Sequence, residues 1–193
     1  IWVEKANSFS PKRYYDLPAI KKEANLYTKW QHSWASNFSS YIDLQYRNVT
    51  HRMDGFQNNP TLNIDRSFGF FNPKIGYQFN KNGWVHYASY AIGHKEPNRD
   101  DFEVGAATQP NREQLQDLEV GLEKRNKKTT WTANFYYMHY KDQLVLTGKI
   151  NDVGAYTRMN VPNSYRLGIE LMHTTILTSK LQLSSNITFS RNK

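Results

Sequence analysis

Residues 38–46 decide the fold class, and they read Phe-Ser-Ser-Tyr-Ile-Asp-Leu-Gln-Tyr. The apolar side chains Phe38, Ile42, Leu44 and Tyr46 all stand at even positions, whereas the odd positions between them are mostly polar. A period of two residues places alternate side chains on opposite faces of an extended chain. The segment is therefore predicted to be a β-strand with one apolar face.

The same period recurs along the chain and predicts an all-β protein. It is clear at 74–79, 118–123, 166–171 and 181–189, and no comparable helical stripe is present. Turn-forming residues lie at 34–37, 80–83, 125–128 and 178–180, and longer polar stretches lie at 1–23, 54–66, 96–113 and 148–154. The predicted strands are 24–34, 38–52, 67–79, 84–95, 114–124, 129–147, 155–177 and 181–191.

Short turns that alternate with long loops indicate an antiparallel up-and-down transmembrane β-barrel. Such barrels have short periplasmic turns, long extracellular loops, and strands that alternate apolar-out with polar-in. Aromatic rings beside the short turns are then expected to form a girdle at the membrane surface, comprising Trp34, Phe38, Phe79, Trp84 and Trp131. A second aromatic band is expected nearer the long loops, at Tyr46, Phe70, Phe71, Tyr90, Tyr137 and Tyr140.

Composition excludes several other classes of protein. The chain has 193 residues, 15% aromatic residues, no cysteine and a formal net charge of +8. Its mean hydropathy is −0.78, and no run of about 18 apolar residues offers a helical membrane span. Without cysteine there is no disulfide scaffold and no thiolate metal site. Lysine and arginine are spread over both ends of the predicted barrel, which argues against a nucleic-acid partner.

Six stretches, in order over residues 38–175, carry a family resemblance. They include Phe-Phe-Asn-Pro-Lys-Ile-Gly-Tyr at 70–77 and Glu-Pro-Asn-Arg-Asp-Asp-Phe at 96–102, and the others are 87–93, 110–121, 136–148 and 160–171. Together they resemble the barrel of TonB-dependent outer-membrane receptors, in the form common in Bacteroidetes. The resemblance implies a 22-stranded barrel around an N-terminal plug, which imports a scarce nutrient. The commonest such cargo is an iron-siderophore or a similar iron complex.

We therefore expect residues 1–193 to be a fragment of about eight strands from such a barrel, with the plug domain absent. The expected location is the cell outer membrane. The expected partners are outer-membrane lipid and lipopolysaccharide, TonB through the missing plug region, and a small-molecule ligand such as an iron chelate. These expectations follow from the resemblance together with the pattern of connections.

Catalytic chemistry is not evident in the sequence. There is no nucleophile elbow, phosphate loop or His-Glu-x-x-His motif, and the adjacent carboxylates Asp100 and Asp101 are expected to diverge. Six histidines are scattered, and no two have the spacing of metal ligands. We predict that the protein is not an enzyme and that it has neither a metal site nor a cofactor.

Ligand contacts are expected at the extracellular mouth, where polar side chains stand on or beside the strand ends. The candidates are Arg52, His94, Lys95, Arg99, Asp100 and Tyr156. A structural interpretation competes with this one for residues 96–101. In that interpretation Arg99 pairs with neighbouring carboxylates and Pro97 fixes the chain where the strand ends.

Two alternatives remain open at this point. One is a small eight-stranded outer-membrane barrel that closes on itself and has an adhesion or structural role. The other is a soluble all-β domain that binds carbohydrate through exposed Trp and Tyr side chains. Burial of Trp30, Trp34, Phe38, Leu44 and Tyr46 against a second sheet would favour the soluble domain over either barrel.

Overall fold

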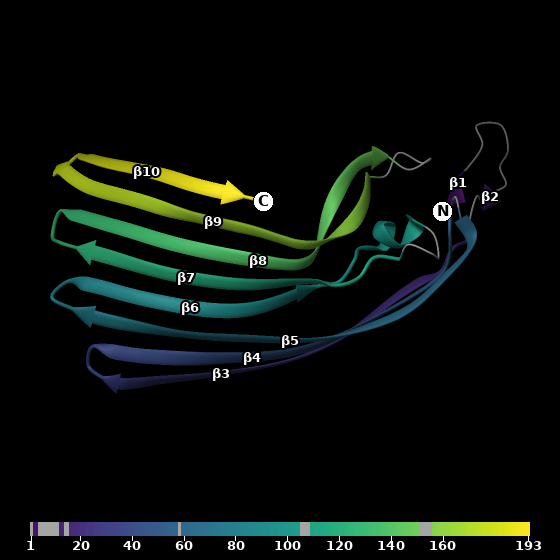
Figure 1. The fold of residues 1–193 in the computed structure, drawn as a ribbon, viewed down its shortest axis with the longest axis horizontal. Helices are drawn as coiled ribbons and strands as arrows, with labels where there is room; N and C mark the ends of the chain where they lie inside the picture. Colours follow the sequence, from purple (N-terminus) through teal and green to yellow (C-terminus); the bar gives the residue numbers. More distant parts are fainter. Residues whose placement is uncertain (1, 4–11, 14–15, 58, 105–108, 151–155) are drawn as a thin grey trace.

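The computed structural model contains one large antiparallel sheet of eight strands in meander order, β3 to β10 (Figure 1). It describes residues 2–3, 12–13, 16–57, 59–104, 109–150 and 156–193. The strands are β3 (Ala19–Ala35), β4 (Phe38–Phe56), β5 (Asn59–Lys81), β6 (Trp84–Lys95), β7 (Glu113–Arg125), β8 (Thr129–Ile150), β9 (Tyr156–Thr178) and β10 (Leu181–Asn192). A 3-10 helix, η1 (Arg99–Val104), lies between β6 and β7, and β1 (Trp2–Val3) pairs with β2 (Lys12–Arg13). None of the described helices is long and apolar enough to cross a membrane.

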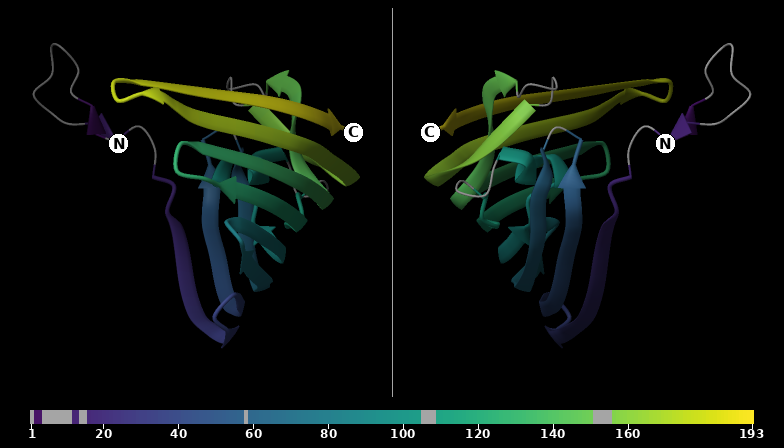
Figure 2. Two further views of the ribbon diagram at one scale, coloured as in Figure 1. Left: turned by 90° about the vertical axis from the view of Figure 1, so that its left-hand side faces the viewer. Right: turned by 90° about the vertical axis from the view of Figure 1, so that its right-hand side faces the viewer.

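All four short turns lie at one end of the sheet, and η1 lies at the other end (Figure 1). The all-β antiparallel fold predicted from the period of two is therefore confirmed. The sheet twists and curves (Figure 2), and β3 and β10 form its two edges. Because these edges do not pair with each other in the described residues, the barrel of eight strands that closes on itself is not the arrangement found.

The two faces of the sheet differ in chemistry. On the face that we call outer, Leu44 is 37% exposed and Tyr46 is 51% exposed. Trp30, opposite Ile42 in the adjacent strand, is 48% exposed, and Trp34 is 60% exposed. Apart from the pair β1–β2, the described residues form no further sheet that covers this face. These side chains are not buried against a second sheet, which was the observation that would have favoured the soluble domain, and an exposed apolar band this extensive fits a lipid-facing wall.

The hydrophobic parity reverses towards the long-loop end. In β4 the apolar side chain of Tyr46 points outward, whereas Val49 and Met53 are buried on the opposite face, which we call inner. In β5 Phe71 points outward and Phe68 is buried on the inner face. The buried core is a cluster at this end, formed by Val49, Met53, Phe56, Leu62, Ile64, Phe68, Phe70 and Phe102.

This reversal explains where the predicted boundaries are wrong. Residues 54–66 were expected to be a loop, but β4 continues to Phe56 and β5 begins at Asn59. Apolar and polar side chains still alternate there, but the apolar ones point inward and the polar ones outward. The segment therefore has the polar composition of a loop although it is a strand. β3 likewise begins at Ala19, within the expected first loop. The connection at 96–113 is confirmed in part, because it holds η1 and lies between β6 and β7.

Four of the six residues expected in the second aromatic band lie on the outer face, and their role as a membrane band stays a prediction. Tyr46, Phe71, Tyr90 and Tyr137 are exposed on the outer face. Phe70 is fully buried on the inner face, and Tyr140 lies opposite Leu115 on that face too. Their assignment to a lipid-facing band is wrong, because β5 and β8 each carry aromatic side chains on both faces.

Inner-face tyrosines cover glycines on neighbouring strands. Tyr41 lies opposite Gly76, Tyr87 opposite Gly121, and Tyr136 opposite Gly168. A methyl group added to Gly76 would come within 2.6 Å of the Tyr41 ring. Glycine is therefore required at these positions because a ring occupies the space above the backbone.

Candidate functional site

A hollow of about 210 Å³ at the long-loop end brings together charged and polar side chains from three segments. Its polar lining includes Lys21 from the start of β3, His51 from the upper part of β4, and Glu96 and Arg99 from the chain that follows β6. Lys21 and His51 are register partners, so both point to the inner face. We call this feature the mouth hollow.

An ion network anchors residue 96 at the hollow. Arg47 Nη1 donates to Glu96 Oε2 over 2.8 Å, and Lys21 Nζ donates to Glu96 Oε1 over 2.9 Å. Arg47 Nε also donates to Glu23 Oε1 over 2.7 Å. Burial raises the pKa of Glu96, but the hydrogen bonds from Arg47 and Lys21 lower it by more, to about 2. The carboxylate therefore stays ionised and holds the start of the loop against β3 and β4.

A second ion pair holds η1 on the far side. Asp101 is 1% exposed, and Arg158 of β9 donates to its carboxylate oxygens over 3.2 Å and 3.3 Å. The backbone N–H of Asn98 also donates to Asp101, over 2.7 Å, and Phe102 is fully buried in the core cluster. The segment 96–104 is thus tied across the inner face, from β4 to β9.

His51 is a buried polar side chain of the mouth hollow whose hydrogen bonding this packing leaves incomplete. It is 6% exposed, with its ring 5.5 Å from that of Phe102 and 6.4 Å from that of Phe68. Within the described residues its Nε2 atom has no hydrogen-bond partner. A buried imidazole nitrogen without a partner is costly, and it is well suited to accept or donate a hydrogen bond to a bound molecule.

The predicted ligand contacts do not all gather at this site. Arg99 lines the hollow and lies 5.6 Å above the ring of Phe56. His94 also turns to the inner face, where it stacks on Phe70 at 5.6 Å and bonds Asn72 through Nδ1 over 2.8 Å. Lys95 and Asp100 are exposed and do not line the hollow. Their role in ligand binding stays a prediction.

Two of the candidates lie elsewhere. Arg52 has outer-face parity, its side chain is 66% exposed, and its guanidinium lies 4.0 Å from Asp54. Tyr156 begins β9, but its side chain falls outside the part of the chain that the structure describes.

Within the described residues, no ion pair joins Arg99 to Glu96, Asp100 or Asp101, the nearby carboxylates of the structural interpretation. Glu96 pairs with Arg47 and Lys21, and Asp101 pairs with Arg158, all distant in sequence. Asp100 and Asp101 do diverge, because one is exposed and the other is buried. In the described residues no group of three or more His, Asp or Glu side chains is placed to hold a metal ion.

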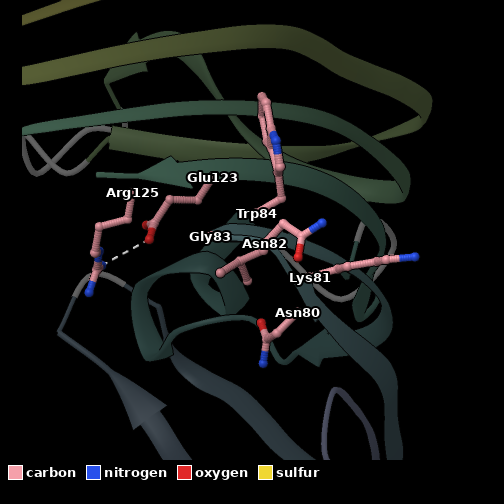
Figure 3. Close-up of a pocket in the computed structure, with 8 residues that line it drawn as sticks. Asn80, Lys81, Asn82, Gly83, Trp84, Glu123 and Arg125 are labelled. Carbon is pink, nitrogen blue, oxygen red and sulfur yellow. Dashed lines mark ion pairs between the residues drawn. The ribbon is translucent and has the colours of Figure 1, made fainter. Parts of the chain in front are cut away.

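Below the mouth the inner face remains polar. A hollow of about 440 Å³ there is lined by side chains that include Lys74, Gln78, Tyr87 and Glu119. A further hollow, of about 410 Å³, lies at the short turn between β5 and β6, where Arg125 pairs with Glu123 over 2.9 Å (Figure 3). The turn hollow lies at the opposite end of the sheet from His51 and holds no buried unpartnered polar group, so the mouth hollow is the stronger candidate.

The residues predicted as an aromatic girdle share the outer face at the short-turn end. Trp34 is 60% exposed, Trp84 39% and Trp131 55%. Each of these tryptophans has a histidine ring beside it, at 4.5 Å, 6.4 Å and 3.9 Å respectively. Phe38 and Phe79 are cross-strand partners. The placement suits a membrane girdle, and that role stays a prediction.

Comparison with families of known proteins identifies one family. A family model described as TonB dependent receptor-like, beta-barrel matches residues 4–193. No match was found among curated proteins. Among solved structures, the fold is similar to that of the copper transporter OprC, with a TM-score of 0.78, 15% identity, and coverage of 91% of this chain and 30% of that one.

Two iron-related structures are also similar in fold. The FrpB iron transporter from Neisseria meningitidis (F3-3 variant) has a TM-score of 0.69 and 16% identity, with coverage of 93% of this chain and 27% of that one. The alcaligin outer-membrane receptor FauA from Bordetella pertussis has a TM-score of 0.67 and 13% identity, with coverage of 92% and 31%. The chain thus spans less than a third of each of these structures.

Proposed function

This chain belongs to the TonB-dependent receptor β-barrel family, and from that premise we propose that it forms part of an outer-membrane pore that imports a scarce nutrient. Members of the family are receptors and transporters of the outer membrane rather than enzymes. In such barrels the short turns face the periplasm and the long loops face the outside. The mouth hollow then opens towards the extracellular side, where a ligand arrives.

The buried Nε2 atom of His51, which has no partner in the described residues, is the single observation that carries the binding proposal. The lining around it brings Lys21 and Arg99 close to the same space. Lys21 and Glu96 pair with each other, so Arg99 is the charged side chain of this lining that makes no ion pair within the described residues. Such a lining favours a ligand with anionic or carbonyl oxygens.

We propose an iron-siderophore or a similar iron complex as the cargo. Iron chelates present oxygen-rich surfaces to their receptors, which matches the donors of the mouth hollow. Similar structures include an iron transporter and an alcaligin receptor, which supports iron, and a copper transporter, which keeps a copper species as the second candidate. The proposed energy-coupling partner is TonB, acting through an N-terminal plug region.

A growth assay tests this proposal. A strain that lacks the receptor is complemented with the full-length receptor, either wild type or carrying His51→Phe, and supplied with a panel of iron chelates, haem, copper, vitamins and oligosaccharides as limiting nutrients. We expect the wild type to restore growth on an iron chelate and His51→Phe to require at least about tenfold more of it, the loss of about one charge-assisted hydrogen bond.

His32→Phe is the matched control, because His32 lies on the outer face between Trp30 and Trp34. This substitution should leave growth unchanged. Growth that depends on the receptor for none of these nutrients would contradict the import proposal. Restored growth that His51→Phe does not alter would instead contradict the assignment of the mouth hollow.

A further inference from the structure

An apolar groove of about 300 Å³ lies on the outer face near the short-turn end, apart from the mouth hollow. Its outer-face lining comes from β6 to β10 and comprises Trp84, Leu122, Trp131, Ala133, Leu171, His173, Ser185 and Ile187. Several of these side chains are well exposed, since Trp131 is 55% and Ile187 56% exposed. We call this feature the outer groove.

The strand register arranges the outer-face side chains at the groove in two rows, which also include Lys124 and His86, two residues that stand beside the lining rather than in it. The row nearer the short turns runs across five strands as Trp84, Lys124, Trp131, His173 and Ser185. The next row, one step further into the predicted membrane, runs as His86, Leu122, Ala133, Leu171 and Ile187. The first row therefore carries ammonium, indole, imidazole and hydroxyl groups, whereas the second is largely aliphatic.

The small side chain of Ala133 leaves room in the second row. Ala133 stands between Leu122 and Leu171, which are its register partners in β7 and β9. Trp131 and His173 stack with ring centroids 3.9 Å apart and form a rigid wall beside it. In such a trough a linear hydrocarbon chain gains contacts on three sides, which a flat surface of leucine side chains would not provide.

The first row contains the positive charge of Lys124, which lies near the short turns, at the level expected for the phosphates of membrane lipids. Lys124 Nζ lies 4.9 Å above the Trp84 ring and donates to the backbone oxygen of Asn82 over 2.7 Å. These contacts hold the ammonium on the outer face, and an ammonium has three donors. Glu123 and Arg125 flank Lys124 with the opposite, inner-face parity and pair with each other over 2.9 Å, and Figure 3 shows this ion pair on a different side of the turn from Trp84.

We propose that the outer groove is a specific site for one glycerophospholipid of the periplasmic leaflet. Its phosphate binds Lys124 in the first row, and one acyl chain lies over Ala133, between Leu122 and Leu171 and beside the Trp131–His173 stack. The order of the rows matches the order of groups in the lipid, with charge at the membrane surface and hydrocarbon one step deeper. The site is independent of the nutrient that the receptor imports.

Native mass spectrometry of the full-length receptor in detergent tests this proposal, with phosphatidylglycerol as the titrated probe. We expect one lipid to remain bound to the wild type. Lys124→Gln should raise the dissociation constant about fivefold, the size expected for one cation near a lipid phosphate. Ala133→Leu fills the trough and should weaken binding at least as much.

The controls match each change in charge or volume. Lys127→Gln removes a lysine of the turn between β7 and β8 that belongs to neither row, and Ala24→Leu enlarges an outer-face alanine of β3. Both should bind lipid as the wild type does, and heat-modifiable gel mobility should show that all four variants are folded. Equal binding by the wild type and Ala133→Leu would overturn the proposal. Equal binding of a diacylglycerol with the same acyl chains would also overturn it, because the phosphate would then not be recognised.

Discussion

Gly121 is the position where a single methyl group tests the packing of the inner face. In Gly121→Ala the new Cβ would overlap the ring of Tyr87, which lies directly opposite on β6. The backbone at Gly121 is not in the left-handed region, so alanine brings no conformational strain there. Any loss of stability must then come from the clash with the ring.

The expected loss of stability in Gly121→Ala has two causes. The ring must move, and overpacking of this kind costs about 1–3 kcal/mol. Tyr87 Oη also donates to Asn134 Oδ1 over 3.3 Å, which bridges β6 to β8. Displacing the ring breaks this bond, at about 1 kcal/mol. The free energy of unfolding is therefore expected to fall by about 2–4 kcal/mol.

The assay is guanidinium-induced unfolding of the full-length receptor in detergent, followed by heat-modifiable mobility and by tryptophan fluorescence. Gly93→Ala is the matched control, since nothing lies within 4 Å of a Cβ added at Gly93. It should change the free energy of unfolding by less than about 0.5 kcal/mol.

A double mutant isolates the clash. Tyr87→Ser removes the ring, so adding Gly121→Ala to it should cost little further stability. A Gly121→Ala protein as stable as the wild type would show that the ring and the methyl group do not clash. An equal loss of stability from the methyl group with and without the Tyr87 ring would also contradict the clash.

Three further predictions concern the mouth and the outer face. Glu96→Gln removes the charge that Arg47 and Lys21 hold, so protease cleavage within 96–104 should rise and the local stability of this segment should fall by about 1–3 kcal/mol. The pKa of Glu96 is lowered from 4.5 to about 2, so its carboxylate stabilises the mouth fully well above pH 4.5. This stabilisation should be lost as the pH falls from 4.5 towards 2. Pepsin cleavage measured over this pH range would detect the loss. Leu44→Arg on the outer face should destabilise folding into lipid vesicles by about 2–4 kcal/mol, whereas Gln45→Arg, one residue away on the inner face, should cost far less.

Each of these three predictions has an outcome that would contradict it. Cleavage of 96–104 that is equal in wild type and Glu96→Gln would mean that the ion network does not hold the segment. Cleavage with the same pH profile in both proteins would remove Glu96 as the titrating group. Equal penalties for Leu44→Arg and Gln45→Arg would mean that the two faces do not meet different media.

Local pattern was sufficient to predict the sheet. The alternation in residues 38–46 and the turn residues at 80–83 act over a few positions, and they located the eight strands and their meander. The aromatic residues Trp34, Trp84 and Trp131 could also be placed on one face near the short turns, because parity and distance from a turn fix both properties.

The mouth could not be predicted in the same way. Lys21 and Glu96 are 75 positions apart in sequence, and Arg158 and Asp101 are 57 apart. Such pairs depend on strand register and on how the loop folds back, which no local pattern encodes. The partial signal that was present is parity, since Lys21, Glu23 and Arg47 all have the inner-face parity of their strands.

Residues 54–66 illustrate a second limit. Beyond the apolar outer band the outward side chains meet water, and the inward side chains of Leu62, Ile64 and Phe68 pack into a core instead. Apolar and polar side chains continue to alternate across this boundary, but the apolar ones now point inward instead of outward. A sequence reading that assigns apolar side chains to one face throughout takes the reversed segment for a loop.

Accumulation of radiolabelled iron, supplied as a chelate that supports growth, tests the central claim most directly. It would be measured in a strain that lacks the receptor and in the same strain complemented with the full-length receptor, each with and without an uncoupler of the proton-motive force. TonB-dependent import predicts accumulation only in the complemented cells, and its collapse when the uncoupler is added. Equal accumulation in both strains, or accumulation that survives the uncoupler, would contradict the account.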